Sequence, residues 1–501
     1  MTANMELDWL KRWNLYSPKN IAIKDGETGR ELSYAELFDM ANRGANLLRT
    51  QYGISKGDRV AVLATNELEY VFAFFALQRL GAIMVPVNFR LTQREVDHII
   101  TDSAPKLILV QEQFASIIEN LPKTLKHDSL LLQGENSFAT KLMEASSEVY
   151  PFVPEETDPV MILYTSGTTG APKGAILTHK MIFWNSINTT FRLNISASDC
   201  TISFLPFFHT AGWNVLTNPF LHRGAKVVFL KKFDADQILA LTEKEKSTIM
   251  FGVPTTLDMM VKSPLFNKVD LSSVRYAIVG GEPMPLELIK VWDKKGIPVR
   301  QGYGLTEFGP SVFSLNEEDA MRKIGSIGFP NFYVEAKVVD NEGKELGDNQ
   351  IGELILQGPA CMQGYWHNEK ATKETIRDGW LYTGDLVRRD SEGYYYVVGR
   401  KKEMFISGGE NVYPVELEQV LRSCPGVAEV AVIGVPDDKW GEVGKAFVVR
   451  QPSVSVEVNH LLDHCLKNLA KFKIPKHFVF LETLPKGDSG KILKRVLQEM
   501  A

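Results

Sequence analysis

Short apolar runs alternate with amphipathic stretches along the first half of the chain, a pattern typical of strands that alternate with helices. The capping-box sequences that run from Ser33 to Glu36 and from Thr92 to Glu95 each predict the start of a helix. The remaining predicted elements of this part are strands at residues 59–63, 82–87 and 106–110 and a helix at 67–80.

A similar layout returns after residue 200, with the same kind of join before its second strand: Arg79-Leu80-Gly81-Ala82 in the first copy and Arg223-Gly224-Ala225 in the second. We therefore infer two βα-type subdomains of related architecture, each a parallel sheet covered by helices. The second copy is predicted to contain strands at 201–205, 225–230 and 248–251 and helices at 210–222 and 235–244.

The sequence pattern changes between residues 325 and 398. Short β-prone segments and frequent glycines there indicate a β-barrel-like or mixed subdomain. A charged junction, residues 400–403, precedes a last region of about a hundred residues, the size of a small α+β domain. Its predicted elements are strands at 429–433, 446–450 and 477–481 and a helix at 458–469. The expected fold class is α/β, with a large N-terminal domain at 1–399 and a small C-terminal domain at 400–501.

Composition narrows the function classes. With 501 residues the chain exceeds the size of a single core, and a net charge of −5 gives no sign of a nucleic-acid partner. Four widely spaced cysteines without a Cys-x-x-Cys pair favour a reducing cytoplasm over a disulfide or zinc framework. The charged start, residues 1–13, is not expected to be a signal peptide. The apolar stretch 71–87 contains Gln78 and Arg79 and is not expected to span a bilayer. Peripheral membrane contact and a homodimer are both left open.

The most informative segment follows the apolar run at residues 160–163. Hydroxyl side chains, glycines and a lysine stand together there, a combination suited to wrapping a polyanion with backbone N–H groups, hydroxyl donors and a mobile cation. The segment does not fit the P-loop pattern G-x-x-x-x-G-K-[ST], and the alternative is a plain surface hairpin. The candidate phosphate-binding residues are Thr165, Ser166, Gly167, Thr168, Thr169, Gly170 and Lys173.

Three further glycine turns carry acidic or basic side chains. In the turn from Gly302 to Glu307 a carboxylate would stand beside a phosphate, an arrangement that a bridging cation makes favourable. The alternative is a turn whose glutamate faces water. Asp385 follows Gly384, and Lys491 follows Gly490 close to the end of the chain.

Taken together, these segments resemble the adenylate-forming (AMP-binding) acyl-CoA synthetase superfamily, in the family's order and from Leu32 to Val496. The motif sequences are most similar to those of medium- and long-chain fatty-acyl-CoA synthetases. The resemblance implies that a carboxylic acid, most closely a fatty acid, reacts with ATP and Mg²⁺ to give an acyl-adenylate and pyrophosphate. Coenzyme A then takes the acyl group and AMP leaves.

The resemblance also implies residue roles around the nucleotide. Thr306 would contact the α-phosphate and Glu307 would hold Mg²⁺, within a turn that also contains Gly302, Tyr303 and Gly304. Gly281 and Glu282 would lie against adenine. Asp385 and Arg400 would bind the ribose hydroxyls. Lys491 would bridge the acid and the α-phosphate, because two anions approach each other more readily beside a cation.

For the second half-reaction the resemblance implies a mobile C-terminal domain that turns about a hinge near Lys402 and brings the loop at Gly408 to the pantetheine of CoA. Lys402-Glu403 stands where many relatives have an aspartate. His209 would line the carboxylate end of the acyl pocket. Trp213 could gate the pocket, although core packing is the better default for it.

Two alternatives to a CoA ligase remain. An adenylation enzyme that loads a carrier protein is less favoured, because the chain ends eleven residues after Gly490 with no carrier domain. A nucleotide- or acyl-binding protein without turnover would be expected to lack one of Lys491, Glu307, Thr306 or Asp385.

Overall fold

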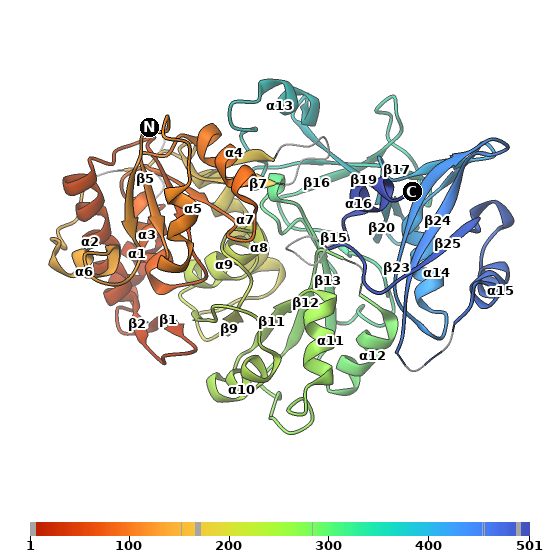
Figure 1. The fold of residues 1–501 in the computed structure, drawn as a ribbon. Coiled ribbons are helices and arrows are strands. Elements are labelled where there is room, and N and C mark those ends of the chain that lie inside the picture. Colours follow the sequence, from red (N-terminus) through yellow and green to blue (C-terminus); the bar gives the residue numbers. More distant parts are fainter. Residues whose placement is uncertain are drawn as a thin grey trace. The chain divides into compact units, whose positions relative to one another are not determined.

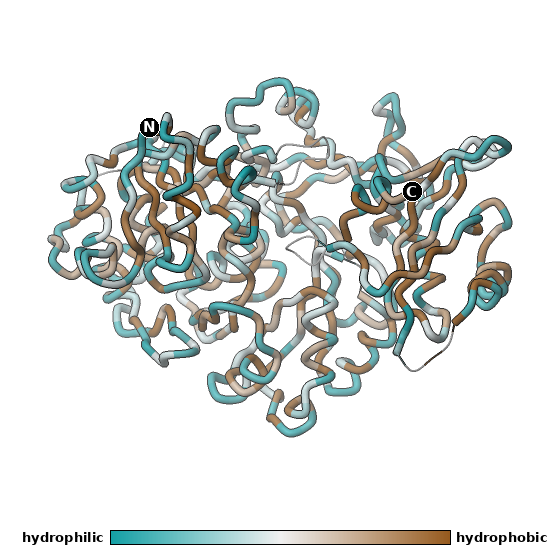
Figure 2. The backbone as a smooth tube through the Cα atoms, in the orientation of Figure 1, coloured by the Kyte–Doolittle hydropathy of each residue, from teal (hydrophilic) through white to brown (hydrophobic). Residues whose placement is uncertain are grey.

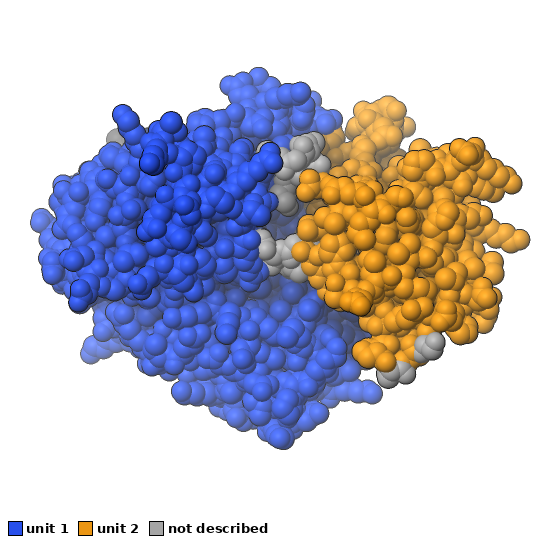
Figure 3. All heavy atoms as spheres, in the orientation of Figure 1, with its two compact units in different colours: residues 1–335, 357–381 blue, residues 336–356, 382–501 orange. Residues whose placement is uncertain are grey.

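The computed structural model describes residues 7–151, 153–165, 172–282, 284–452, 454, 456–486 and 492–501. By its internal contacts the chain divides into two compact units (Figure 3). Unit 1 contains residues 1–335 and 357–381, and unit 2 contains residues 336–356 and 382–501. In the described part of the chain, no helix combines the length and the apolar character needed to cross a bilayer.

The first sheet of unit 1, of which Figure 1 labels strands β5 and β7, has six strands in the order β6-β5-β3-β4-β7-β8. Its neighbours pair in parallel, except that β8 runs antiparallel to β7. Parallel strands covered on both faces are apolar along their whole length, and Figure 2 shows this inner part of the chain as hydrophobic. The strands are β3 Arg59–Leu63, β4 Ile83–Pro86, β5 Leu107–Val110, β6 Asp128–Leu131, β7 Pro159–Thr165 and β8 Lys173–Thr178.

Both predicted capping boxes are confirmed. At the start of α2 (Tyr34–Tyr52), the Ser33 backbone N–H donates to the Glu36 carboxylate at 2.7 Å while Glu36 N–H donates to Ser33 Oγ at 3.3 Å. Thr92 and Glu95 form the same box at α4 (Gln93–Ser103). The other helices of this part are α3 Leu68–Gln78, α5 Ala115–Glu119 and α6 Phe138–Glu144. The predicted alternation of strand and helix is therefore present.

The second predicted subdomain is also present, but the N-terminal strands join it. The parallel pair β9 (Cys200–Ser203) and β10 (Lys226–Phe229) continues into β1 and β2, in the order β2-β1-β10-β9. A further sheet has the order β11-β12-β13-β14-β15 and is parallel from β11 to β13. The remaining strands are β1 Ile21–Asp25, β2 Glu31–Ser33, β11 Ile249–Gly252, β12 Tyr276–Val279, β13 Val299–Tyr303, β14 Phe313–Ser314 and β15 Phe329–Pro330.

The single helix predicted at residues 210–222 was wrong. The structure has two short helices there, α8 (Thr210–Asn214) and α9 (Thr217–His222). Pro219 explains the break, because proline has no N–H to donate to the carbonyl of Val215 and its ring crowds that carbonyl. The other helices of unit 1 are α1 Trp9–Tyr16, α7 His179–Arg192, α10 Ala235–Glu245, α11 Pro254–Lys262, α12 Leu286–Lys294 and α13 Glu369–Thr375.

Short strands follow after residue 334, as predicted. They form a five-stranded sheet in which β16, β17, β19 and β18 are neighbours in that order and β20 pairs with β19. Strand β19 was not predicted as a strand. The bounds are β16 Glu335–Val339, β17 Ile351–Gln357, β18 Ile376–Arg377, β19 Trp380–Arg389 and β20 Tyr395–Arg400.

The last hundred residues form an α+β arrangement around one more sheet, in the order β22-β21-β24-β23 with β25 parallel to β24. The predicted strands at 429–433 and 446–450 are parts of a longer hairpin, because β23 and β24 stay paired up to Asp437 and Gly441. The bounds are β21 Phe405–Ser407, β22 Glu410–Val412, β23 Val427–Asp437, β24 Gly441–Arg450, β25 His477–Leu481, α14 Pro414–Arg422, α15 Val458–Asn468 and α16 Lys494–Glu499.

Candidate active site

Two ends of the predicted phosphate loop meet at the tip of the β7–β8 pair. Thr165, the last residue of β7, is the register partner of Lys173, the first residue of β8. Thr165 Oγ1 lies 3.4 Å from the Lys173 carbonyl oxygen. The predicted loop residues Ser166, Gly167, Thr168, Thr169 and Gly170 lie outside the described residues. The predicted strand–loop–strand arrangement is thus confirmed at both of its ends.

Both ends of this loop are attached to helix α4. The sequence predicted the helix but not this attachment. On the β7 side, the Tyr164 hydroxyl donates to Asp102 Oδ2 at 2.6 Å. On the β8 side, His98 Nε2 donates to the Pro172 carbonyl at 3.2 Å. Burial and the Asp102 carboxylate raise the pKa of Tyr164, so its hydroxyl stays protonated and remains a donor. One helix therefore sets the positions of both residues that flank the loop.

The segment from Gly302 to Glu307 begins with the last two residues of β13 and continues into a turn. Its threonine and glutamate lie in a short 3₁₀ helix, η2 (Thr306–Phe308). A Cβ atom on Gly304 would stand 1.5 Å from the Pro310 carbonyl oxygen, so only glycine allows the backbone to fold back this tightly. The close approach fixes where the two side chains leave the backbone.

The Glu307 carboxylate lies against the phosphate-loop strand. Its Oε1 accepts hydrogen bonds from the Tyr365 hydroxyl at 2.9 Å and from Thr165 Oγ1 at 3.5 Å. The structure therefore brings Thr165, Lys173 and Glu307 together from three separate segments. Tyr365 is the fourth member of this group, and sequence reasoning missed it.

The donor set around Glu307 fits Mg²⁺. This ion prefers oxygen ligands and is usually held by one or two carboxylates together with substrate phosphates. Within the described ranges, no three His, Cys, Asp or Glu side chains converge as a protein metal cage would require. A single carboxylate at the end of the predicted phosphate loop is the arrangement expected for a metal that arrives with a nucleotide.

The predicted adenine turn lies at the neighbouring strand. Gly280, Gly281 and Glu282 follow β12, and β12 is parallel to β13 with Val279 opposite Gln301. Gly281 has a φ of +85°, which favours glycine. Because the carboxyl ends of adjacent parallel strands lie at one sheet edge, this turn and the Gly302 turn lie side by side, as in open α/β sheets that bind nucleotides.

The predicted acyl-pocket segment is held in place by Asn66. Asn66 Oδ1 accepts from Phe207 N–H at 3.0 Å, and Asn66 Nδ2 donates to the Leu205 carbonyl at 2.9 Å. His209 is half-buried and immediately precedes α8. Trp213 is fully buried and stacks on Phe207 with ring centroids 4.2 Å apart, which is the core-packing role favoured for it from the sequence.

A small hollow lies beside this segment in unit 1. Leu205, Ala211, Leu216 and Phe251 give it an apolar wall. Its other lining residues are Thr201, Ile202, Ser203, Phe204 and Thr217, of which Ser203 and Thr217 bond each other at 3.0 Å. The hollow therefore has both apolar and hydroxyl-bearing walls, and the Thr201 hydroxyl donates to the Ile249 carbonyl at 2.9 Å.

In unit 2 the structure brings the two predicted ribose ligands together. Asp385 and Arg400 are register partners across β19 and β20, and Arg400 Nε lies 2.6 Å from Asp385 Oδ1. Asp385 is 4% exposed, whereas Arg400 is exposed. The preceding Gly384 donates its N–H to Glu353 Oε1 at 3.1 Å, and Lys401 bonds the other oxygen of Glu353 at 2.8 Å. This network holds the turn on which Asp385 lies.

The predicted CoA loop is a tight hairpin. Gly408 and Gly409 join β21 to β22, with φ values of +61° and +89°, as a two-residue hairpin turn requires. A Cβ atom on Gly408 would lie 2.7 Å from the Trp440 ring.

Burial lowers the pKa of Lys402 at the predicted hinge. Lys491 lies outside the described residues.

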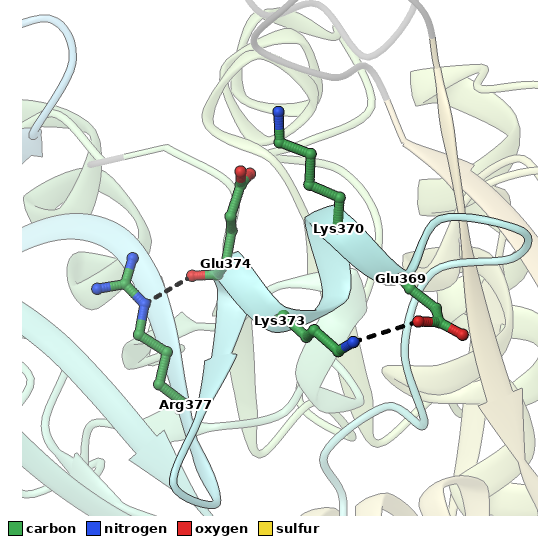
Figure 4. Close-up of a pocket in the computed structure, with 5 residues that line it drawn as sticks. All are labelled: Glu369, Lys370, Lys373, Glu374 and Arg377. Carbon is green, nitrogen blue, oxygen red and sulfur yellow. Dashed lines mark hydrogen bonds and ion pairs between the residues drawn. The ribbon is translucent and has the colours of Figure 1, made fainter.

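A separate surface hollow on α13 contains none of the predicted site residues (Figure 4). Its charged side chains bond within the same segment, Lys373 to Glu369 at 3.2 Å and Arg377 Nε to the Glu374 carbonyl at 2.9 Å. Lys370 completes its lining. The mixed charges and local pairing give this hollow no recognisable chemistry.

Comparison with known proteins agrees with this geometry. The AMP-binding enzyme family matches residues 10–366, and the AMP-binding enzyme C-terminal domain matches residues 416–491. A feruloyl-CoA synthase of Amycolatopsis sp. is 38% identical over 489 residues, covering 97% of this chain and 97% of that protein. The long-chain-fatty-acid–CoA ligase FadD13 of Mycobacterium tuberculosis (strain CDC 1551 / Oshkosh) is 36% identical over 498 residues, covering 98% of each chain. The crystal structure of ATP-bound MatB from Rhodopseudomonas palustris is 35% identical, with a TM-score of 0.92 and 99% of each chain covered.

The chain therefore belongs to the AMP-binding enzyme family. Within that family it is an AMP-forming acid–CoA ligase that uses ATP, Mg²⁺ and coenzyme A. The acid itself is not decided by these relatives, because their printed names specify different acids.

Proposed function

We propose that this ligase activates a fatty acid as its acyl-adenylate and transfers the acyl group to CoA. The observation that carries the adenylation step is the contact between the Glu307 carboxylate and Thr165, where the phosphate-loop strand ends. A carboxylate at that place would repel phosphates unless a cation lay between them. Mg²⁺ bound there would neutralise charge on the phosphates.

The nucleotide contacts follow from the same proposal. Residues 165–173 hold the phosphates, and Thr306 donates its hydroxyl to the α-phosphate. The Gly281–Glu282 turn lies along adenine, and Asp385 accepts hydrogen bonds from the ribose hydroxyls with Arg400 beside it. These roles are supported by the pairing of Thr165 with Lys173 and of Asp385 with Arg400.

Lys491 supplies the cation for the first half-reaction. The acid and the α-phosphate are both anions, and a lysine between them offsets their repulsion by several kcal/mol at about 4 Å and an effective dielectric constant near 20. We place Lys491 on a mobile domain, residues 400–501, which turns about Lys402 and then presents the Gly408 hairpin to CoA. Gly409 supports this role, because a Cβ atom added there would meet nothing within 4 Å, so the tip of the hairpin has open space for a narrow pantetheine chain.

One comparison supports a fatty acid as the acyl donor: FadD13, which is 36% identical to this chain, is named a long-chain-fatty-acid–CoA ligase. An aromatic acid is the second candidate, because the feruloyl-CoA synthase is 38% identical to this chain. The free cysteines, including Cys361 and the buried Cys200, support the cytoplasm as the place of action.

Pyrophosphate release tests the acid. The protein is given ATP, Mg²⁺ and saturated fatty acids of graded length, with ferulate and indoleacetate in parallel, each with and without CoA. The proposal expects the highest kcat/KM with a fatty acid. A higher value with ferulate or indoleacetate would replace the fatty acid with the aromatic alternative, and no release with any acid would overturn adenylation itself.

Lys491→Ala tests the proposed catalytic lysine. The variant should lose pyrophosphate release while still converting supplied acyl-AMP and CoA to thioester at close to the original rate. Lys486→Ala is the matched control, because Lys486 is a nearby surface lysine that pairs with Glu429 at 2.8 Å. Equal losses in both half-reactions would contradict a role confined to adenylation.

A further inference from the structure

Tyr365 reaches the candidate active site through backbone pairing with β8. The N–H of Ile176 donates to the Gly364 carbonyl at 2.9 Å, and the N–H of Trp366 donates to the Gly174 carbonyl at 2.7 Å. These bonds flank an antiparallel bridge between Ala175 and Tyr365. Tyr365 is therefore tied to the strand that leaves the predicted phosphate loop.

The same segment is also tied to the turn that carries Glu307. Met362 N–H donates to the Glu307 carbonyl at 2.9 Å. Tyr365 N–H donates to Thr372 Oγ1 at 2.9 Å, which fixes the backbone on the other side. The backbone at Tyr365 is therefore held by hydrogen bonds to β8, η2 and α13, and this fixes where its side chain begins.

The Tyr365 side chain contacts two proposed ligands of the nucleotide. Its hydroxyl donates to Glu307 Oε1 at 2.9 Å. Lys173 Nζ lies over its ring, 5.4 Å from the centroid, within the range of a cation–π contact. One side chain therefore joins the proposed metal ligand to the lysine of the phosphate loop.

We propose that Tyr365 is a positioning residue that orients Glu307 for Mg²⁺ and holds Lys173 at the phosphates. The proposal rests on the function proposed above. Both Tyr365 and Thr165 bond Oε1 of the carboxylate, so Oε2 is the oxygen that neither hydroxyl uses. The hydroxyl sets the rotation of the carboxylate, and the ring limits where the lysine ammonium can lie.

A tyrosine hydroxyl ionises only at about pH 10, so the Tyr365 phenol is protonated at physiological pH and can donate to the carboxylate.

Two substitutions separate the two contacts. Tyr365→Phe removes the hydroxyl and keeps the ring over Lys173, whereas Tyr365→Leu removes both. Tyr396→Phe is the matched control, because Tyr396 also donates to a carboxylate, Asp390 Oδ2 at 3.2 Å, in unit 2. Circular dichroism and thermal unfolding of each variant show whether it is folded.

The main readout is ATP binding in the absence of acid, measured by calorimetry over a Mg²⁺ titration. Hydrogen bonds to charged groups are stronger than those between neutral groups, so Tyr365→Phe should raise the half-saturating Mg²⁺ concentration about tenfold. ATP affinity at saturating Mg²⁺ should stay within about twofold of the original for Tyr365→Phe and fall for Tyr365→Leu, which also loses the contact with Lys173. A Mg²⁺ titration of Tyr365→Phe that matches those of Tyr396→Phe and the original protein would overturn the proposal.

Glu307→Gln distinguishes failure of this proposal from failure of the proposed function. If Glu307→Gln raises the Mg²⁺ requirement and Tyr365→Phe does not, only the role of Tyr365 is wrong. If neither substitution moves the titration, Glu307 is not the metal ligand and both proposals fall. A double-mutant cycle of Tyr365→Leu with Lys173→Gln should be non-additive for ATP affinity. Additive effects would contradict the proposal that the Tyr365 ring holds Lys173 at the phosphates.

Discussion

The Arg400 guanidinium and the Asp385 carboxylate form an ion pair, with Nε 2.6 Å from Oδ1, between two residues that already face each other across paired strands. Strand register therefore places the pair before any nucleotide binds. Because Asp385 is buried and ion-paired with the exposed Arg400, the carboxylate is held with a defined orientation. This is the preorganisation that recognition of two adjacent hydroxyls requires.

Asp385→Asn should therefore weaken recognition of the ribose. A hydrogen bond to a charged acceptor contributes about 1.5–3 kcal/mol, so kcat/KM for ATP should fall about 10- to 100-fold. The original protein should also discriminate against 2′-deoxy-ATP and 3′-deoxy-ATP, and the variant should discriminate much less. Pyrophosphate release with the three nucleotides measures both effects.

The control for this prediction is Asp340→Asn, which changes a carboxylate that caps a turn by accepting from Lys344 N–H at 2.8 Å. It should leave nucleotide discrimination unchanged. If Asp385→Asn kept the full preference for ATP over both deoxynucleotides, Asp385 would not be the ribose ligand.

Gly304→Ala should disable the site through the backbone. The added Cβ would stand 1.5 Å from the Pro310 carbonyl oxygen, so the turn must open and move Thr306 and Glu307. Displacements of about 1 Å can lower rates about 100-fold, and we expect a loss of at least that size in pyrophosphate release. Gly347→Ala is the control, because the nearest atom to its added Cβ is 3.8 Å away. Equal activity of the two variants would show that the close approach at Gly304 does not constrain the site.

Local sequence predicted those parts of the fold that local interactions determine. The predicted strands at residues 59–63 and 477–481 coincide with β3 and β25, because each is a short apolar run with clear ends. The helix at 210–222 was predicted too long because the apolar pattern was given more weight than Pro219. The joining of β1 and β2 to β10 depends on pairing between distant segments, which periodicity does not report.

The residues of the candidate site also fall into those that the sequence predicted and those that only the fold reveals. Thr165, Lys173, Glu307 and Asp385 were predicted because each lies in a glycine-containing motif, and Arg400 was predicted through the family resemblance. Tyr365 was missed because only its pairing with β8 brings it to Glu307, and no pattern around it indicates that partner. The same holds for Asp102 and His98, whose role at the phosphate loop arises from the position of α4.

Lys494 should stabilise the end of unit 2. Its Nζ lies 2.8 Å from Glu418 Oε1 and 3.1 Å from Glu403 Oε2, and its side chain is 15% exposed. Burial alone would lower the pKa of Lys494, but the two carboxylates outweigh burial and raise it. Lys494→Met leaves both carboxylates without this cation, which typically costs about 3–5 kcal/mol for a buried pair.

Thermal unfolding followed by circular dichroism measures this effect. Arg495→Ala is the matched control, since Arg495 is the next residue, is exposed and lies 4.0 Å from Glu499. Because Glu403 adjoins the proposed hinge, Lys494→Met should also change the ratio of the two half-reaction rates. A melting temperature equal to that of Arg495→Ala would show that the buried ion pairs do not stabilise the unit.

Two buried histidines should make the protein acid-sensitive. Burial lowers the pKa of His179 to about 4 and that of His222 to about 3, against about 6.5 in an unfolded chain. Asp158 opposes the shift at His179, and Lys56 adds to it. Because the unfolded state takes up the protons more readily, the stability from both groups is complete above about pH 6.5 and is lost as the pH falls toward 4 and 3. At pH 5 each histidine should cost about 2 kcal/mol relative to neutral pH.

His222→Asn tests this dependence, because asparagine can still bond Ser186, whose Oγ lies 2.8 Å from His222 Nδ1. The variant will be less stable at neutral pH, since it loses the stacking of His222 on Trp9 at 4.2 Å. The decisive quantity is therefore the slope: its melting temperature should fall less between pH 7.5 and 5 than that of the original protein. His477→Asn, at an exposed position, should keep the original slope. If His222→Asn and His477→Asn showed the same decline, protonation of His222 would not contribute to acid unfolding.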